Sequence, residues 1–161
     1  MRDVYSKIQP RDVLAAMCCD LKAGGETIVF TNGVFDVLHA GHVEYLNFAR
    51  AQGNLLIVGL NSDTSVRRYK GEKRPINLQE DRSLLLASLE AVDYVTIFDE
   101  DEPKALLKAL LPQMLVKGAD WEHLVVGREI VEENGGRIIL APFKDGCSSS
   151  SMIDRIIDVY G

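Results

Sequence analysis

The sequence predicts an α/β fold in which a doubly wound, five-stranded parallel sheet carries helices on both faces. Short runs rich in β-branched residues alternate with helical runs along the chain, and the strand runs are apolar at successive positions rather than at alternate ones. A strand that is apolar on both faces must be covered on both. Each crossover between parallel strands returns across one face of the sheet, so the alternation itself indicates a layered fold.

The elements follow one another in regular order. Residues 9–21 should form a leading helix, because apolar residues recur there at helical spacing, with Pro10 near the start and Gly24 and Gly25 after the end. The expected strands are 27–31, 55–60, 94–97, 114–117 and 137–140, and the further helices are 41–52, 78–89, 103–111, 126–134 and 149–160. Residues 1–161 then form one domain, with the leading helix inside 1–25 and the catalytic core at 27–155.

The composition excludes several classes of protein. A chain of 161 residues with 47% hydrophobic and 26% charged residues suits one compact domain with a real core. No apolar run is long enough to cross a bilayer and the N-terminus lacks a signal-peptide pattern, so we expect a cytoplasmic protein without a membrane partner. The net charge of −6 argues against a broad nucleic-acid footprint. Cys18, Cys19 and Cys147 lack metal-ligand spacing and are interpreted as reduced thiols, with Cys147 packing in a loop.

The turn after the first strand carries the densest chemistry. It leads into a helix through His39-Ala-Gly-His42, and if that helix begins near Ala40 the two imidazoles emerge on the same side of its first turn. The helix N-terminus offers unpaired N–H groups and positive potential, and Gly41 lets the backbone approach closely. This combination suits a phosphate. Metal ligation, or an ordinary cap or surface role, is the alternative for the two histidines.

A basic stretch follows the second strand. Residues 67–74 are the only dense basic run in an acidic chain, and a glycine makes them a candidate mobile loop that could close over phosphates through Lys70 and Arg74. A merely solvated loop is the alternative. Arg82, which we expect on an exposed helix turn, could also reach inward.

Two further strand ends are polar. Asn61 and Asp63 follow the second strand and either cap a helix or accept ligand hydroxyls. Lys117, Gly118 and Asp120 follow the fourth strand. There the lysine could neutralise phosphate, while the aspartate could cap a turn or contact ribose; ordinary loop chemistry is the alternative for both.

The last helix opens with Ser148, Ser149, Ser150 and Ser151. A serine run at this position supplies an N-cap and several hydroxyl donors beside free backbone N–H groups, which together form a second seat for an anion. A simple cap with redundant serines is the alternative.

The stretch Gly33-Val-Phe-Asp-Val-Leu-His-Ala-Gly-His42 resembles the signature of the nucleotidyltransferase superfamily, whose histidine motif is similar to that of class I aminoacyl-tRNA synthetases. The resemblance implies that His39 and His42 contact the triphosphate around the reacting α-phosphorus, with Lys70 as a third catalytic group. The implied nucleotide contacts are Thr31, Asn32, Gly33, Phe35, Gly41, His42, Lys117, Gly118, Asp120, Ser148, Ser149, Ser150 and Ser151. The implied substrate contacts are Asp36, which orients the turn or the substrate, with Asn61, Asp63, Arg74 and Arg82.

Within that superfamily, the chain from about Thr27 to Arg155 resembles the adenylyltransferase domain of ADP-heptose synthases, through Lys-Gly, Arg-Pro-Ile-Asn, Glu-Asp-Arg, Leu-Glu-Ala-Val-Asp-Tyr, Val-Lys-Gly and Gly-Cys-Ser in order. The resemblance implies ATP and Mg²⁺, D-glycero-β-D-manno-heptose 1-phosphate as acceptor, and a role in lipopolysaccharide or surface glycan precursor synthesis. It also implies a homodimer with contacts near residues 89–95. Ala119 departs from the family pattern, which has a second glycine there.

Two other functions remain open from the residues alone. One is a cytidylyltransferase that uses CTP with glycerol 3-phosphate or phosphoethanolamine. The other is a nucleotide-binding protein without turnover, which the intact His39 and His42 disfavour.

Overall fold

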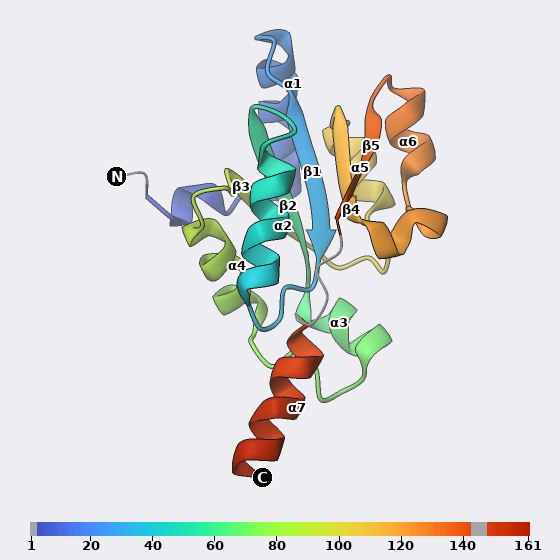
Figure 1. Ribbon diagram of the computed structural model, residues 1–161. Helices are drawn as coiled ribbons and strands as arrows, with labels where there is room; N and C mark the ends of the chain where they lie inside the picture. Colours follow the sequence, from blue (N-terminus) through green and yellow to red (C-terminus); the bar gives the residue numbers. More distant parts are fainter. Residues whose placement is uncertain (1–2, 143–147) are drawn as a thin grey trace.

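The computed structural model describes residues 3–142 and 148–161, and its centre is one parallel sheet (Figure 1). The five strands lie in the order β3-β2-β1-β4-β5. Their bounds are Ile28–Gly33 (β1), Leu55–Asn61 (β2), Tyr94–Phe98 (β3), Met114–Gly118 (β4) and Arg137–Ala141 (β5). The predicted five-stranded, all-parallel sheet is therefore confirmed, and the fold is Rossmann-like.

The expected helices are present, each with both ends within two residues of the prediction. The α-helices are α1 (Arg11–Ala23), α2 (Ala40–Arg50), α3 (Asp63–Lys70), α4 (Gln79–Ser88), α5 (Lys104–Leu110), α6 (Arg128–Glu133) and α7 (Ser149–Tyr160), and the two 3-10 helices are η1 (Tyr5–Lys7) and η2 (Ala119–Leu124).

Helix α3 was not predicted, because its residues read as the start of a mobile basic loop. The chain folds there since the Ser62 hydroxyl caps the helix, accepting a hydrogen bond from the Ser65 amide at 3.0 Å, and since Val66 is buried against the core. The helix ends at Gly71, whose φ of 90° favours glycine. The basic side chains of residues 67–70 therefore project from a short helix.

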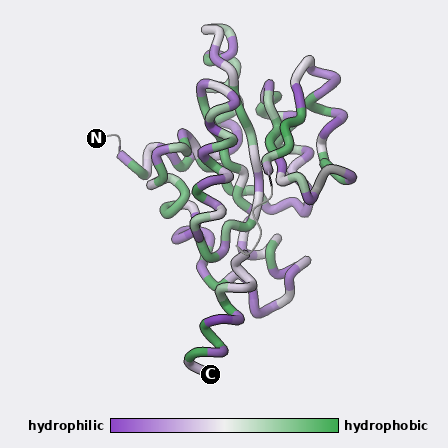
Figure 2. The backbone as a smooth tube through the Cα atoms, viewed as in Figure 1, coloured by the Kyte–Doolittle hydropathy of each residue, from purple (hydrophilic) through white to green (hydrophobic). Residues whose placement is uncertain are grey.

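The helices form a layer on each face of the sheet. Helices α2 and α4 pack on one face over a core cluster that includes Leu46 and Leu86, and α1, α5 and α6 pack on the other over a cluster that includes Leu14 and Leu107. Figure 2 shows the hydrophobic strands running between these layers. Apolar burial on both faces explains why the strands read as continuous hydrophobic runs.

The strand order reverses between β1 and β4. The chain goes from β1 outward to β2 and β3, then returns to β4 on the other side of β1. These two strands pair only at Val29–Met114 and Phe30–Leu115, whereas β1 and β2 pair along six residues. The carboxyl ends of β1 and β4 therefore have no register partners in each other, and a crevice at such a reversal is where open α/β sheets bind ligands.

Helix α7 extends away from the body of the protein beyond the carboxyl end of the sheet (Figure 1), and none of its residues is buried. Residues 89–95, where the resemblance implies a dimer contact, contribute Ala91, Val92 and Val95 to the core. Among the helices of the described residues, none has the length and apolar character needed to cross a membrane.

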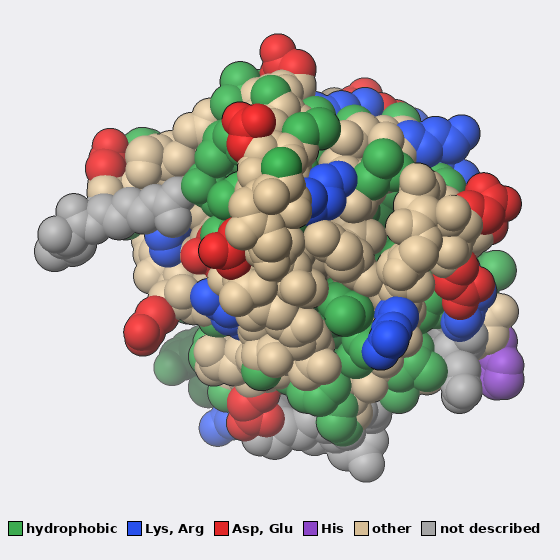
Figure 3. Space-filling view, turned by 90° about the horizontal axis from the view of Figure 1, so that it is seen from above, with side chains coloured by type: hydrophobic (Ala, Val, Ile, Leu, Met, Phe, Trp, Pro, Cys, Tyr) green, Lys and Arg blue, Asp and Glu red, His purple; other side chains and the backbone are tan. Residues whose placement is uncertain are grey.

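The opposite end of the molecule, seen from above in Figure 3, carries acidic and basic side chains interspersed among each other. Of the three cysteines, Cys18 is buried and Cys19 exposed, and both are free thiols as expected. Cys147 lies outside the described residues.

Candidate active site

A cavity of about 1040 Å³ opens at the carboxyl ends of β1 and β4. Its size is that of a ligand site. Most of the residues predicted for the site line it: Asn32, Gly33, Phe35, Asp36, His39, Gly41, His42, Asn61, Lys70, Arg74, Lys117, Gly118, Asp120, Ser148, Ser149 and Ser150. Four do not: Thr31, Asp63, Arg82 and Ser151.

The two motif histidines stack on each other. Helix α2 begins at Ala40, with His39 at the N-cap position, and the ring centroids of His39 and His42 lie 3.8 Å apart at an angle of 26° between the planes. The expectation that both rings emerge on the same side of the first turn is confirmed. The Nδ1 atoms of both rings are buried without a hydrogen-bond partner among the described residues. A buried polar atom without a hydrogen bond is costly, and a ligand bound in the cavity would supply the missing partners.

Burial also sets the charge of the pair. It lowers the pKa of His39, and it lowers the pKa of His42 to about 4, with the neighbouring His39 adding to the effect. Both imidazoles are therefore neutral near pH 7 in the free protein, and each carries one N–H donor and one acceptor nitrogen. A bound polyphosphate would favour their charged forms.

Phe35 supports His42 from the turn. Its ring centroid lies 5.2 Å from that of His42, and its backbone has a φ of 46°, in the left-handed region. A Cβ atom at Gly33 would lie 3.0 Å from the Phe35 ring. A side chain at position 33 would therefore require the Phe35 ring to shift by a few tenths of an ångström.

Tyr45 closes the gap between the carboxyl ends of β1 and β4. Its hydroxyl lies 2.7 Å from the Thr31 hydroxyl and donates to the Val116 carbonyl at 3.0 Å. Burial raises the pKa of Tyr45 to about 12. Thr31 is fully buried beneath the cavity and does not line it, and its predicted contact with the nucleotide stays a prediction.

Lys117 provides a partly buried cation on the β4 side. Its ammonium donates to Asn32 Oδ1 at the end of β1, and burial lowers its pKa to about 8. Gly118 and Asp120 follow it along the cavity wall. The lysine and the histidine pair thus line the same cavity from opposite sides of the β1–β4 reversal.

The serine run caps α7 and ties it to the catalytic turn. The Ser148 hydroxyl accepts from the Ser151 amide at 3.0 Å, and the Ser148 amide donates to the Ser151 hydroxyl at 3.1 Å, which makes a capping box. The Ser149 hydroxyl donates to the Val37 carbonyl at 3.1 Å. Ser148, Ser149 and Ser150 line the cavity, whereas Ser151 forms part of the cap and does not line it, so its predicted phosphate contact stays a prediction.

Asp36 fastens the basic segment to the turn. Its buried carboxylate accepts from Arg74 Nε at 2.6 Å and from the amides of Ile76 and Asn77 at 2.8 and 2.9 Å. Burial raises the pKa of this carboxyl, but the two amides and the guanidinium outweigh burial and leave the pKa below its usual range. This geometry agrees with a role in orienting the turn. Lys70 lines the same part of the cavity, and its pKa is lowered by burial and by Arg74.

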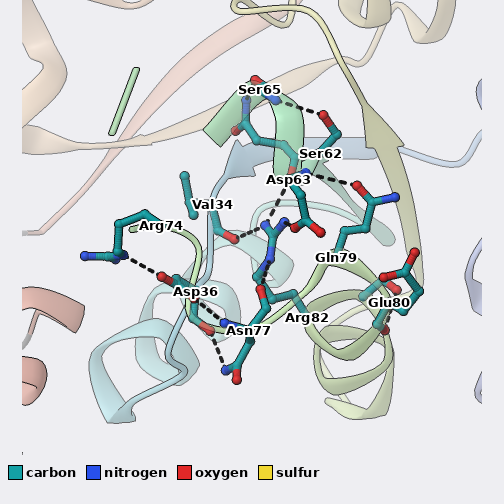
Figure 4. Close-up of polar contacts among 12 residues, drawn as sticks. Val34, Asp36, Ser62, Asp63, Ser65, Arg74, Asn77, Gln79, Glu80 and Arg82 are labelled. Atoms are coloured by element: carbon teal, nitrogen blue, oxygen red, sulfur yellow. Dashed lines mark hydrogen bonds and ion pairs between the residues drawn. The ribbon is translucent and has the colours of Figure 1, made fainter. Parts of the chain in front are cut away.

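Arg82 is buried rather than exposed, which corrects the prediction. Its guanidinium has no exposed surface and forms an ion pair with Asp63 at 2.7 Å (Figure 4). Neither residue lines the cavity, so the structure gives no support to the expected contacts of Arg82 and Asp63 with substrate, which stay predictions. Asn61 does line the cavity, and its Nδ2 donates to the Ser65 hydroxyl at 3.1 Å.

Some lining residues were missed. Tyr45 lies three residues after His42, on the same face of α2, so helical spacing could have indicated it. Asp101 and Glu102 follow β3 at the same edge of the sheet, where the carboxyl ends of all parallel strands meet. Among the residues that the structure describes, no three His, Cys, Asp or Glu side chains form a group that could hold a metal ion.

The chain is similar in sequence to proteins of a known family. The model of a family described as cytidylyltransferase-like matches residues 30–155. The chain is 54% identical over 159 residues to bifunctional protein HldE of Pelobacter propionicus and 52% identical over 151 residues to that of Wolinella succinogenes. It covers 98% and 93% of its own length in these matches but 33% and 31% of theirs, so it spans about a third of the length of these relatives.

Solved structures share the fold. A lipopolysaccharide core biosynthesis protein from Thermoplasma volcanium matches with a TM-score of 0.60 and 26% identity, over 74% of this chain and 98% of that one. Pantoate-beta-alanine ligase from Francisella tularensis matches with a TM-score of 0.61 and 17% identity, over 89% and 68% of the two chains, and supports the fold alone.

Proposed function

The chain belongs to the cytidylyltransferase-like family of nucleotidyltransferases, and from this premise we propose that it transfers AMP from ATP to D-glycero-β-D-manno-heptose 1-phosphate. The products are ADP-heptose and pyrophosphate, and the pathway served is lipopolysaccharide or surface glycan precursor synthesis. The similarity to HldE over 98% of the chain supports this choice of substrate.

The observation that carries the proposal is the stacked histidine pair at the mouth of α2. Two neutral imidazoles, whose Nδ1 atoms have no hydrogen-bond partner within the described part of the chain, line a cavity that Lys117 and the N-terminus of α7 also line. Nucleotidyl transfer requires a protein to position the reactants and to stabilise charge that spreads over phosphate oxygens, and these groups suit that task.

The reaction is an in-line displacement. An oxygen of the sugar phosphate attacks the α-phosphorus, a new P–O bond forms, and the bond from the α-phosphorus to the bridging oxygen breaks so that pyrophosphate leaves. His39 and His42 stabilise the charge on the reacting phosphate, and Ser148, Ser149 and Ser150 receive the leaving phosphates at the start of α7.

The acceptor binds on the β2 side of the cavity. Lys70 and Arg74 line that side, and Arg74 keeps guanidinium nitrogens beyond the one that bonds Asp36. Arginine suits a phosphate because its N–H groups match the spacing of phosphate oxygens. Asn61, at the end of β2, lies beside them.

Mg²⁺ fits this site as an ion carried by the phosphates. The described residues offer no three-ligand protein group, and magnesium bound to nucleotides keeps several water and phosphate ligands. When bound it neutralises charge on the leaving pyrophosphate. We assign no protein ligand to it.

We further propose a cytoplasmic homodimer. A reaction that consumes ATP belongs in the compartment that supplies it, and a dimer is what the resemblance implies. Sedimentation of the purified chain at several concentrations tests the oligomeric state, and a species of 17.9 kDa throughout would rule out the dimer.

The substrate is tested by incubating the chain with Mg²⁺, with ATP or CTP, and with a panel of heptose 1-phosphate anomers, glycerol 3-phosphate and phosphoethanolamine. Mass detection should find ADP-heptose, and the double variant His39→Ala, His42→Ala should give none while remaining folded. A CDP-linked product would favour the cytidylyltransferase alternative. Tight ATP binding without any product would favour a binding protein.

A further inference from the structure

Arg82 is the side chain that joins the separate segments of the acceptor side. Its Nε donates to the Asn77 carbonyl at 2.9 Å, and its Nη1 donates to the carbonyls of Val34 and Asn61 at 2.7 and 2.9 Å. Its Nη2 pairs with Asp63 at 2.7 Å. Figure 4 shows the guanidinium at the centre of these contacts.

These partners come from four places in the chain. Val34 lies in the turn that leads to the histidines, Asn61 ends β2, Asp63 begins α3, and Asn77 ends the segment that carries Arg74. A planar guanidinium with five donors can hold several acceptors in fixed directions, which a lysine ammonium cannot.

A structural role alone does not account for this residue. A fully buried guanidinium is expensive to desolvate, and apolar residues of similar volume often stabilise a protein as well or better. The hydrogen bonds of Arg82 go to carbonyls around the edge of the cavity. They do not reach the core between helix and sheet, where the neighbouring Leu86 and Ala87 pack.

The contacts continue from Arg82 to the cavity. Arg82 holds the carbonyl of Asn77, whose amide and side chain bond Asp36 at 2.9 and 2.7 Å, and Asp36 in turn holds Arg74. The segment 74–77 is therefore fastened to the turn through both Arg82 and Asp36. Only Arg74 and Asp36 of these residues line the cavity.

We propose that Arg82 is a positioning residue for the acceptor phosphate: it fixes the segment 74–77 against the catalytic turn so that Arg74 and Lys70 are held across the cavity from His39 and His42. The inference rests on the proposed function for what the acceptor is. It concerns a residue that does not itself touch the substrate.

The test compares Arg82→Lys with the matched control Arg50→Lys. Arg50 also bonds a carbonyl, that of Gly53 at 2.6 Å, and a carboxylate, that of Asp93 at 3.0 Å, but next to the amino ends of β2 and β3. In Arg82→Lys the KM for heptose 1-phosphate should rise about tenfold while the Kd for ATP stays within about twofold of wild type. In Arg50→Lys neither constant should change.

Amide hydrogen exchange gives a readout that needs no acceptor. The amides of Ile76 and Asn77, which bond Asp36, should exchange about tenfold faster in Arg82→Lys and at the wild-type rate in Arg50→Lys. A milder variant, Asn77→Ala, removes only the side-chain bond to the Asp36 carbonyl and should raise the acceptor KM about threefold. It decides the question if Arg82→Lys does not fold.

Unchanged exchange at both amides, or an acceptor KM that stays at the wild-type value in folded Arg82→Lys and in Asn77→Ala, would overturn the inference. An equal loss of affinity for ATP would overturn it too, because that would mean a general loss of structure. If the wild-type chain makes no product from heptose 1-phosphate, the proposed function fails, and the exchange rates still decide whether Arg82 orders the segment.

Discussion

Replacing His42 by leucine should make the protein more stable and much less active. In the free protein the Nδ1 of His42 is buried without a partner among the described residues, and its ring lies between those of His39 and Phe35. A buried polar atom without a hydrogen bond costs about 1–3 kcal/mol. Leucine has a similar size, a better helix propensity and no such atom, and the substitution removes no side-chain hydrogen bond between His42 and another described residue.

The expected gain in the free energy of unfolding is about 1 kcal/mol, the low end of that range, because the stacked contact with His39 is lost. For a chain of this length it corresponds to a rise in Tm of about 2–4 °C. The loss in activity is larger: one donor removed from a developing phosphate charge lowers kcat by about 10²–10³-fold. Stability and activity therefore move in opposite directions, as at sites shaped for a ligand.

The assay pairs scanning calorimetry with continuous detection of pyrophosphate. His123→Leu is the control, since this third histidine is exposed and does not line the cavity. A Tm for His42→Leu several degrees below wild type would identify His42 as a packing residue. Activity above about a tenth of wild type would refute its role at the reacting phosphate.

Three further predictions follow from the same cavity. Burial holds the pKa of His42 near 4, below its ordinary 6.5, so the unfolded chain binds more protons than the folded chain between these two values. The free energy of unfolding should therefore fall by up to about 3 kcal/mol as the pH drops from 6.5 towards 4, and Tm should fall with it. Tyr45→Phe should cost about 1–2 kcal/mol in urea unfolding, because Thr31 and the Val116 carbonyl lose their shared partner. ATP affinity, measured by calorimetry, should weaken above pH 8 as Lys117 loses its proton, and Lys117→Met should bind about tenfold more weakly at pH 7 without that pH dependence.

The sheet and its helices could be predicted because their signals are local. Strands buried on both faces leave continuous apolar runs, and helix ends carry caps and glycines, so all five strands and every α-helix of the described residues except α3 were expected within two residues of their positions. The placement of the histidine pair could be predicted for the same reason, because its signal is also local. A spacing of three residues at a helix start brings two rings to one side whatever the rest of the fold does, and the rings are 3.8 Å apart.

Helix α3 and Arg82 could not be predicted in this way. Only Ser65 and Val66 of α3 are buried, so the helix has little apolar surface, and its many charged residues suggested a loop. Arg82 is charged, and charged residues are mostly exposed, which is why an exposed turn was expected. Its partners at positions 34, 61 and 77 come from distant parts of the sequence, and no local pattern connects them.

The cavity has two halves, which differ in how well the sequence predicts them. The half we assign to the nucleotide is built from short continuous segments, 33–42, 117–120 and 148–150, each at the end of a strand or the start of a helix. The half we assign to the acceptor depends on hydrogen bonds between segments that are distant in the sequence, and Asp36 and Arg82 form these bonds. If these assignments hold, a signature in continuous sequence reports the transfer chemistry, whereas our proposal makes the choice of acceptor depend on how the segment 74–77 is held. Substitutions that change acceptor choice should accordingly concentrate at the partners of Asp36 and Arg82 rather than in the histidine motif.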